Sequence, residues 1–157
     1  MTMDEIISFV DSLDGVLSQQ AHSGDGSPEI AWGDTFFYYA PDGVIPQATQ
    51  PFATIVTKNY PGDETSRLDR PEVFRVNMAA GRDEFIAHTG RAPRDTDTPT
   101  DRNAPSPDAL DVVMAHPVYG SLGWLAVNSP GPASVAEVRR LLKQPHQLAR
   151  SRYLRRI

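Results

Sequence analysis

The sequence predicts an α+β fold in which an antiparallel or mixed sheet has its helices packed on one face. Amphipathic helical patterns lie at the two ends of the chain, and short segments with β-branched and aromatic residues fill the region between them. Size agrees, because 157 residues with 39% hydrophobic and 22% charged side chains suit one domain with a real core. We therefore expect a single α+β domain over residues 1–157.

The first helix is predicted from a capping box at its start. Thr2 and Glu5 have the spacing at which a hydroxyl accepts from a backbone amide while the glutamate reaches back. Gly15 follows the last apolar position and can adopt the left-handed conformation that ends a helix. The apolar residues between them recur at helical spacing: Ile6, Ile7, Phe9, Val10 and Leu13.

Strands are expected in the middle of the chain. Residues 35–40 are aromatic, whereas residues 52–58 and 72–78 alternate in the way that half-buried strands do. Residues 123–128, with the sequence GWLAVN, predict a further strand in which Trp124 is buried.

Two further segments are assigned by composition and by helix-end signals. Residues 82–89 predict a short helix closed by Gly90. Residues 91–107 are rich in Pro, Asp, Thr and Arg and predict a mobile surface loop.

A long C-terminal helix is expected after Ser134, which forms a second capping box with Glu137. Pro145 should kink that helix or make it restart, because proline lacks the amide and clashes with the preceding turn.

Charge and composition narrow the classes of function. The formal net charge is −5, of which residues 134–157 contribute +6, so residues 1–133 carry −11. The basic end either neutralises the acidic body or meets an anionic partner. The chain has no cysteine, which excludes disulfides, thiol catalysis and cysteine-ligated metals. No apolar run approaches the roughly 20 residues of a membrane span, and the acidic start does not resemble a signal peptide, so we expect a cytoplasmic protein without membrane contact.

Four stretches resemble the MmcQ/YjbR-like group of small bacterial proteins. They are Ala-Trp-Gly-Asp at residues 31–34, Phe-Arg-Val-Asn at residues 74–77, the His-Pro corner through Trp124, and the final helix. Over nearly its whole length the chain is also similar to an actinobacterial family of unknown function. The first resemblance implies a compact YjbR-like fold with a frataxin-like sheet, and nucleic-acid binding has been suggested for that group. Residues 59–70 and 91–107 are longer here than that group's pattern.

The candidate ligand site consists of six residues. His116 and Tyr119 flank a proline and offer a proton-carrying imidazole beside a phenol. Trp32 and Asp34 offer an apolar wall and a carboxylate at a turn. The remaining two, Arg75 and Asn77, share one face of a strand and suit an anion such as carboxylate or phosphate.

Each of these pairs also has a purely structural interpretation. His116 and Tyr119 suit a packed corner, and Trp32 with Asp34 suits a strand-to-strand turn. Arg75 and Asn77 suit the solvated face of a half-exposed sheet.

The leading hypothesis is therefore a domain that binds a small ligand in a pocket beside the sheet, between the sheet and the 116–124 corner. A nucleic-acid-binding module that uses the basic C-terminal helix is the second hypothesis, and an enzyme with His116 as general acid or base is the third. We expect no cofactor and no metal site, because the four histidines lack metal-ligand spacing. The sequence does not give the oligomeric state. The basic residues of the second hypothesis are Arg139, Arg140, Lys143 and Arg150.

Overall fold

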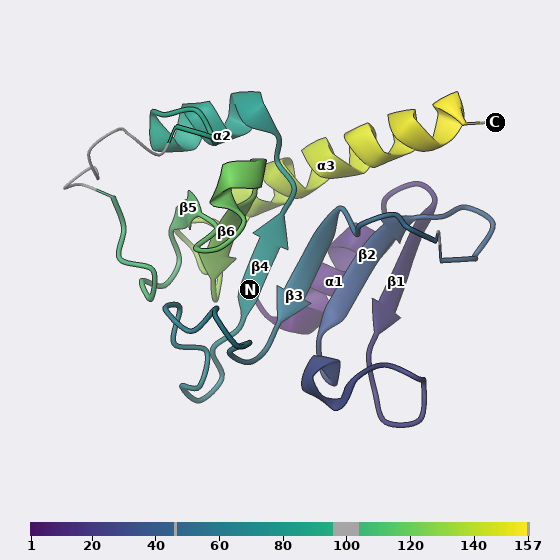
Figure 1. Ribbon diagram of the computed structural model, residues 1–157, viewed down its shortest axis with the longest axis horizontal. Helices are drawn as coiled ribbons and strands as arrows, with labels where there is room; N and C mark the ends of the chain where they lie inside the picture. The colour runs from purple at the N-terminus through teal and green to yellow at the C-terminus, as the bar shows by residue number, and fades with distance from the viewer. Residues whose placement is uncertain (46, 96–103, 157) are drawn as a thin grey trace.

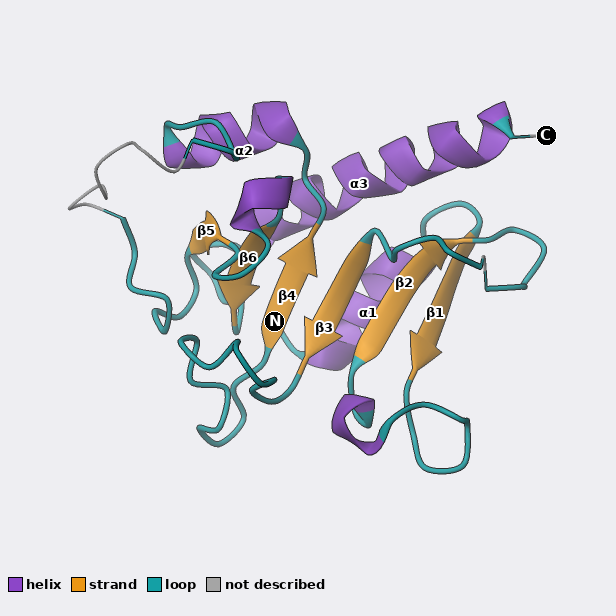
Figure 2. Cartoon of the chain, viewed as in Figure 1, coloured by secondary structure: helices purple, strands orange, loops and turns teal. Residues whose placement is uncertain are grey.

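The computed structural model describes residues 1–45, 47–95 and 104–156 (Figures 1 and 2). These residues form six strands in one sheet, three α-helices and two short 3-10 helices. Residues 96–103 of the expected mobile loop lie outside the described residues. In chain order the elements are α1 (Met3–Asp11), β1 (Val16–Gln20), η1 (Glu29–Ala31), β2 (Thr35–Tyr39), β3 (Ala53–Val56), β4 (Arg75–Met78), α2 (Arg82–Thr89), β5 (Val113–Ala115), η2 (Gly120–Leu122), β6 (Leu125–Asn128) and α3 (Val135–Arg155).

The strand order is β1-β2-β3-β4-β6-β5, and every neighbouring pair of strands is antiparallel. The first four strands follow one another as a meander, whereas the last two exchange places so that Val76 of β4 pairs with Val127 of β6. The predicted α+β class is confirmed, and of its two forms the sheet is the antiparallel one.

The hydrophobic core lies on the face of the sheet that α1 and α3 cover, which is the far face in Figure 1. Side chains alternate along each strand, so every second residue points toward the helices. The fully buried members of this core include Phe37, Ile55, Val76, Leu125 and Val127 from the strands and Ile6, Val10, Val138, Leu141 and Leu142 from the helices.

None of the helices in the described residues is both long and apolar enough to cross a lipid bilayer.

Two expectations about the C-terminal third differ from the structure. β6 begins at Leu125, and Trp124 is half-buried instead of buried, because its ring lies beside an open groove described below. Of the two outcomes expected at Pro145, the restart is wrong, because α3 continues through the proline to Arg155, and Pro145 itself is buried.

The two capping boxes have different outcomes. Thr2 caps α1 as predicted, since its hydroxyl accepts from the Glu5 amide at 3.1 Å. Ser134 stands at the start of α3 but makes no capping bond of its own, so the second capping box is wrong. Instead, Asp111, which precedes β5, accepts from the amides of Gly131 and Ser134 at 2.7 and 2.9 Å and from the Ser134 hydroxyl at 2.6 Å. A carboxylate distant in sequence therefore holds Ser134 and the turn that leads into α3.

Replacing Asp111 with Asn should lower the free energy of unfolding at neutral pH by about 1 kcal/mol, the usual worth of a helix-capping side chain. The Ser134 hydroxyl, opposed by burial and helped by backbone amides, holds the pKa of Asp111 below its usual value. A carboxyl group with a depressed folded pKa stabilises the protein above its unfolded pKa of about 3.9, and that stabilisation is lost as the pH falls through the folded pKa.

The difference between wild type and Asp111→Asn should therefore shrink in acid. Urea unfolding at neutral and acidic pH measures it, with Asp69→Asn as the control because Asp69 is exposed. An equal loss in the control would contradict the capping role.

Candidate functional site

β4 presents two polar side chains on the face of the sheet opposite the helices. Val76 and Met78 belong to the core, so the alternation of the strand directs Arg75 and Asn77 to the other side. Both are nevertheless buried, with 2% and 3% of their surface exposed. The cover comes from residues 57–74, which connect β3 to β4, and from the corner that follows β5.

Each nitrogen of the Arg75 guanidinium donates to an acceptor within the protein. Its NH1 and NH2 groups donate to the two carboxylate oxygens of Asp63 at 3.0 and 2.6 Å, a bidentate ion pair. NH1 also donates to the Ser66 hydroxyl at 3.0 Å, and Nε donates to the Asn77 side-chain oxygen at 2.7 Å. Burial acts to raise the pKa of Asp63, but the hydrogen bonds and charge of Arg75 outweigh it, and the pKa is lowered.

His116 closes the same cluster from the other edge. Its Nδ1 accepts from the amides of Val118 and Tyr119 at 3.1 and 2.9 Å, and its Nε2 lies 3.2 Å from the NH2 group of Arg75. Burial, followed by the charge of Arg75, lowers the pKa of His116 to about 4, so the imidazole is neutral near pH 7. The two amides assign the ring proton to Nε2. Nε2–H and the guanidinium are then two donors that face each other.

A second buried cluster forms around Asp34, which has no exposed surface. Its carboxylate accepts from the amide and hydroxyl of Thr57, both at 2.8 Å, from Lys58 Nζ at 3.0 Å, and from the Tyr60 hydroxyl. Burial and the neighbouring Asp34 raise the pKa of Tyr60, so the phenol remains the donor. Lys58 also donates to the Trp32 carbonyl at 2.7 Å.

The six predicted site residues thus fall into two clusters. Arg75 donates to Asn77 and lies 3.2 Å from His116 Nε2, and the Tyr119 ring packs on the His116 ring with centroids 5.0 Å apart. Trp32 and Asp34 form the other cluster. The connection between β3 and β4 links the two, because it carries Tyr60 to Asp34 and Asp63 to Arg75. Ligand binding by these six residues stays a prediction.

The four basic residues of the nucleic-acid hypothesis each meet a partner within the chain. Arg139 and Lys143 lie over the Phe9 ring, and Arg150 Nε is 3.4 Å from Asp14. Arg140 binds both carboxylate oxygens of Glu84 at 2.7 and 2.8 Å and also binds Glu137.

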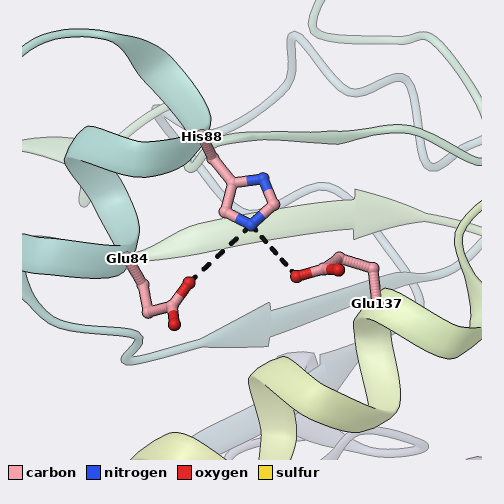
Figure 3. A group of neighbouring side chains, drawn as sticks. All are labelled: Glu84, His88 and Glu137. Carbon is pink, nitrogen blue, oxygen red and sulfur yellow. Dashed lines mark hydrogen bonds and ion pairs between the residues drawn. The ribbon is translucent and has the colours of Figure 1, made fainter.

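That last contact is part of a cluster in which His88, Glu84 and Glu137 converge between α2 and α3 (Figure 3). Arg140 lowers the pKa of both glutamates, against the opposing effect of burial.

A groove of about 400 Å³ opens between the second half of α3, the segment before β3 and the corner before β6. Its apolar walls come from aromatic and aliphatic side chains, which suits the body of a small organic ligand. Burial raises the pKa of Tyr38, so its phenol is neutral at ordinary pH. The residues that line the groove include Tyr38, Phe52, Trp124, Leu148, Arg152, Tyr153 and Arg156.

Two guanidinium groups line this groove without an acidic partner. Arg152 makes no hydrogen bond or ion pair with any residue that the structure describes, and Arg156 reaches only the Thr49 hydroxyl, at 3.4 Å. Within residues 1–45, 47–95 and 104–156, no carboxylate lies within 4.0 Å of either. The groove therefore combines an apolar wall with uncompensated positive charge.

Sequence reasoning missed the groove and the α2–α3 cluster. In the sequence, Arg152 and Arg156 belong only to the basic C-terminal end, and their position beside Trp124 and Tyr153 depends on contacts between distant segments. The Glu84–His88 spacing of one helical turn lies within the predicted helix, but the expectation of no metal does not pair a histidine with a carboxylate on one helix face.

Substituting Arg75 by Met should lower the free energy of unfolding by about 3–5 kcal/mol, because Asp63 loses the partner that compensates its burial. The Arg75→Met/Asp63→Leu double variant should recover part of the loss, since the unpaired carboxylate is gone. Guanidinium chloride unfolding measures both. A stable Arg75→Met protein would show that the guanidinium is not needed for folding and would favour its predicted role in anion binding.

Comparison with known proteins gives a family but no activity. No curated protein and no solved structure matches the chain. A family model, described as a family of unknown function (DUF6194), matches residues 1–157. The chain therefore belongs to the DUF6194 family.

Proposed function

We propose that this domain binds a small amphipathic anion in the groove beside α3. The proposal rests on one observation. The guanidinium groups of Arg152 and Arg156 line an apolar groove, and neither has a carboxylate partner among the described residues. In a chain whose net charge is −5, basic side chains readily find acidic neighbours, as Arg140 and Arg150 do on the same helix. Arg152 and Arg156 remain available for a carboxylate or a phosphate from outside.

The walls of the groove support an apolar body for this ligand. Trp124 and Tyr153 offer flat rings, and Leu148, with 37% of its surface exposed, adds an aliphatic side chain that the core does not cover. A cavity of about 400 Å³ lies within the usual range of small-molecule sites. The neutral phenol of Tyr38 adds a hydrogen-bond donor and no repulsion. This proposal keeps the predicted pocket beside the sheet but moves it to the helix side.

Four of the six predicted residues, Arg75, Asn77, His116 and Tyr119, support a second ligand site at His116. Nε2–H of His116 and NH2 of Arg75 are donors 3.2 Å apart, and a bound acceptor such as a carboxylate oxygen would satisfy both. Tyr119 covers this point and is 51% exposed, so its ring is the side from which a ligand would enter. A pKa of about 4 makes His116 a weak base at neutral pH, which favours binding over acid–base catalysis.

The remaining sequence hypotheses rank below ligand binding. The resemblance to MmcQ/YjbR-like proteins supports nucleic-acid binding by α3, but Arg139, Arg140, Lys143 and Arg150 have partners within the chain. A bacterial source rests on the same resemblance. The proposed cytoplasmic location rests on the missing cysteines.

The groove is tested with decanoate and decan-1-ol, which share an apolar chain and differ in charge. In a Trp32→Phe background, Trp124 is the remaining tryptophan and reports binding by its fluorescence. Decanoate should bind more tightly than the alcohol. The Arg152→Gln/Arg156→Gln variant should lose at least roughly tenfold in decanoate affinity, since hydrogen bonds to charged groups are worth about 1.5–3 kcal/mol each.

Arg155→Gln is the matched control, because Arg155 lies on the same helix and, among the described residues, its side chain bonds only to the Ser151 carbonyl, at 3.3 Å. Its affinity for decanoate should equal that of the parent protein. Equal binding of the acid and the alcohol, or an equal loss in the control, would contradict the anion-binding groove.

Duplex DNA should bind weakly at most, without sequence preference, and the affinity should fall steeply with salt because released counterions drive such binding. Fluorescence anisotropy of a labelled duplex at low and physiological salt measures this. Tight binding at physiological salt would favour the nucleic-acid hypothesis over the small-ligand hypothesis.

A further inference from the structure

Three potential metal ligands meet where α2 touches the first turns of α3 (Figure 3). Glu84 and His88 lie one helical turn apart on α2, so their side chains share a face. Glu137 reaches them from α3. His88 Nε2 is 3.2 Å from Glu137 Oε1 and 3.9 Å from Glu84 Oε2, and the three ligand atoms all lie within 4.8 Å of one another.

These separations are close to those that a metal ion imposes. Zinc binds histidine nitrogen and carboxylate oxygen at about 2.0–2.2 Å, which places tetrahedral ligand atoms about 3.4 Å apart. The distance from His88 to Glu137 already fits, and the distance from His88 to Glu84 must shorten by about half an ångström. Rotation of the Glu84 carboxylate can supply this, because the side chain is 18% exposed and lies outside the core.

We propose that Glu84, His88 and Glu137 bind a divalent transition-metal ion of the Zn²⁺ class and that its remaining coordination positions face solvent. One imidazole with two carboxylates is a borderline ligand set that suits Zn²⁺ or Co²⁺ better than Mg²⁺ or Ca²⁺, which take oxygen alone. The ion would join α2 to α3. This site does not depend on the groove beside the second half of α3.

Arg140 holds the position of the cation while no metal is bound. Its NH1 and NH2 groups bind both oxygens of Glu84, and its Nε donates to Glu137 Oε1 at 2.8 Å. The side chain is 52% exposed, so it can swing into solvent when an ion enters. Metal binding is therefore an exchange of one cation for another between the same two carboxylates, and Arg140 weakens it.

This competition separates a metal site from a salt-bridge cluster that only fastens the two helices. In a metal site, removal of Arg140 strengthens metal binding and removal of His88 weakens it. In a salt-bridge cluster, neither change affects the affinity for metal, and both lower stability at most slightly.

The experiment uses Co²⁺ absorption as a direct probe, Zn²⁺ as competitor, and the melting temperature with and without Zn²⁺. The whole chain should bind one Co²⁺, and His88→Ala and Glu137→Gln should each lose at least about tenfold in affinity. Arg140→Gln should gain about tenfold, which corresponds to about 1.4 kcal/mol. Zn²⁺ should raise the melting temperature of wild type and of Arg140→Gln, because the ion binds the folded state.

His22→Ala is the matched control, since His22 is exposed beside Asp25 and distant in sequence from the cluster. It should bind Co²⁺ as wild type does. The proposal is overturned if His88→Ala binds as tightly as wild type, or if neither wild type nor Arg140→Gln binds Co²⁺. If Glu84→Gln, which removes a ligand and frees Arg140, kept wild-type affinity, Glu84 would be excluded as a ligand and the three-residue site with it.

Discussion

Arg75 places a guanidinium group on the face of the central strand β4 that the helices leave uncovered. A buried guanidinium without partners would cost several kcal/mol, so each of its donors needs a partner. The acceptors come from separate segments: Asp63 and Ser66 from the β3–β4 connection and Asn77 from β4 itself, while His116 from the corner after β5 lies against the same guanidinium. The buried charge therefore fixes two irregular segments against the sheet.

The buried Arg75–Asp63 ion pair also affects the surroundings of Asp34. Once Asp63 is held on Arg75, the connection between β3 and β4 also brings Tyr60 to the Asp34 carboxylate, where Lys58 and Thr57 complete the set of donors. The two faces of the sheet are thus stabilised by different physics. Apolar burial holds α1 and α3 on one face, and matched polar groups hold the connection on the other.

Two of the proposed binding sites, the groove and the metal site, involve α3, one at each end of the helix. The helix is long, and its second half extends past the strands (Figure 1), so its apolar and basic side chains there are only partly covered. Near its start, Glu137 and Arg140 meet α2 instead. The arginines of one helix therefore differ in availability: Arg140 is held between two carboxylates, whereas Arg152 has no partner among the residues that the structure describes.

The sequence by itself determined the class of fold, the approximate strands, the Thr2 cap and the basic character of the last helix. These features follow from local sterics and from periodicities of two and 3.6 residues, which a single chain displays directly. Only the tertiary structure decided that Asp111 caps α3, that Arg75 pairs with Asp63, and that Trp124 borders a groove. Each joins segments 12 or more residues apart, and no local pattern encodes which charge or ring meets which. Partner choice depends on how the whole chain buries its apolar surface and then matches the polar groups that this burial encloses.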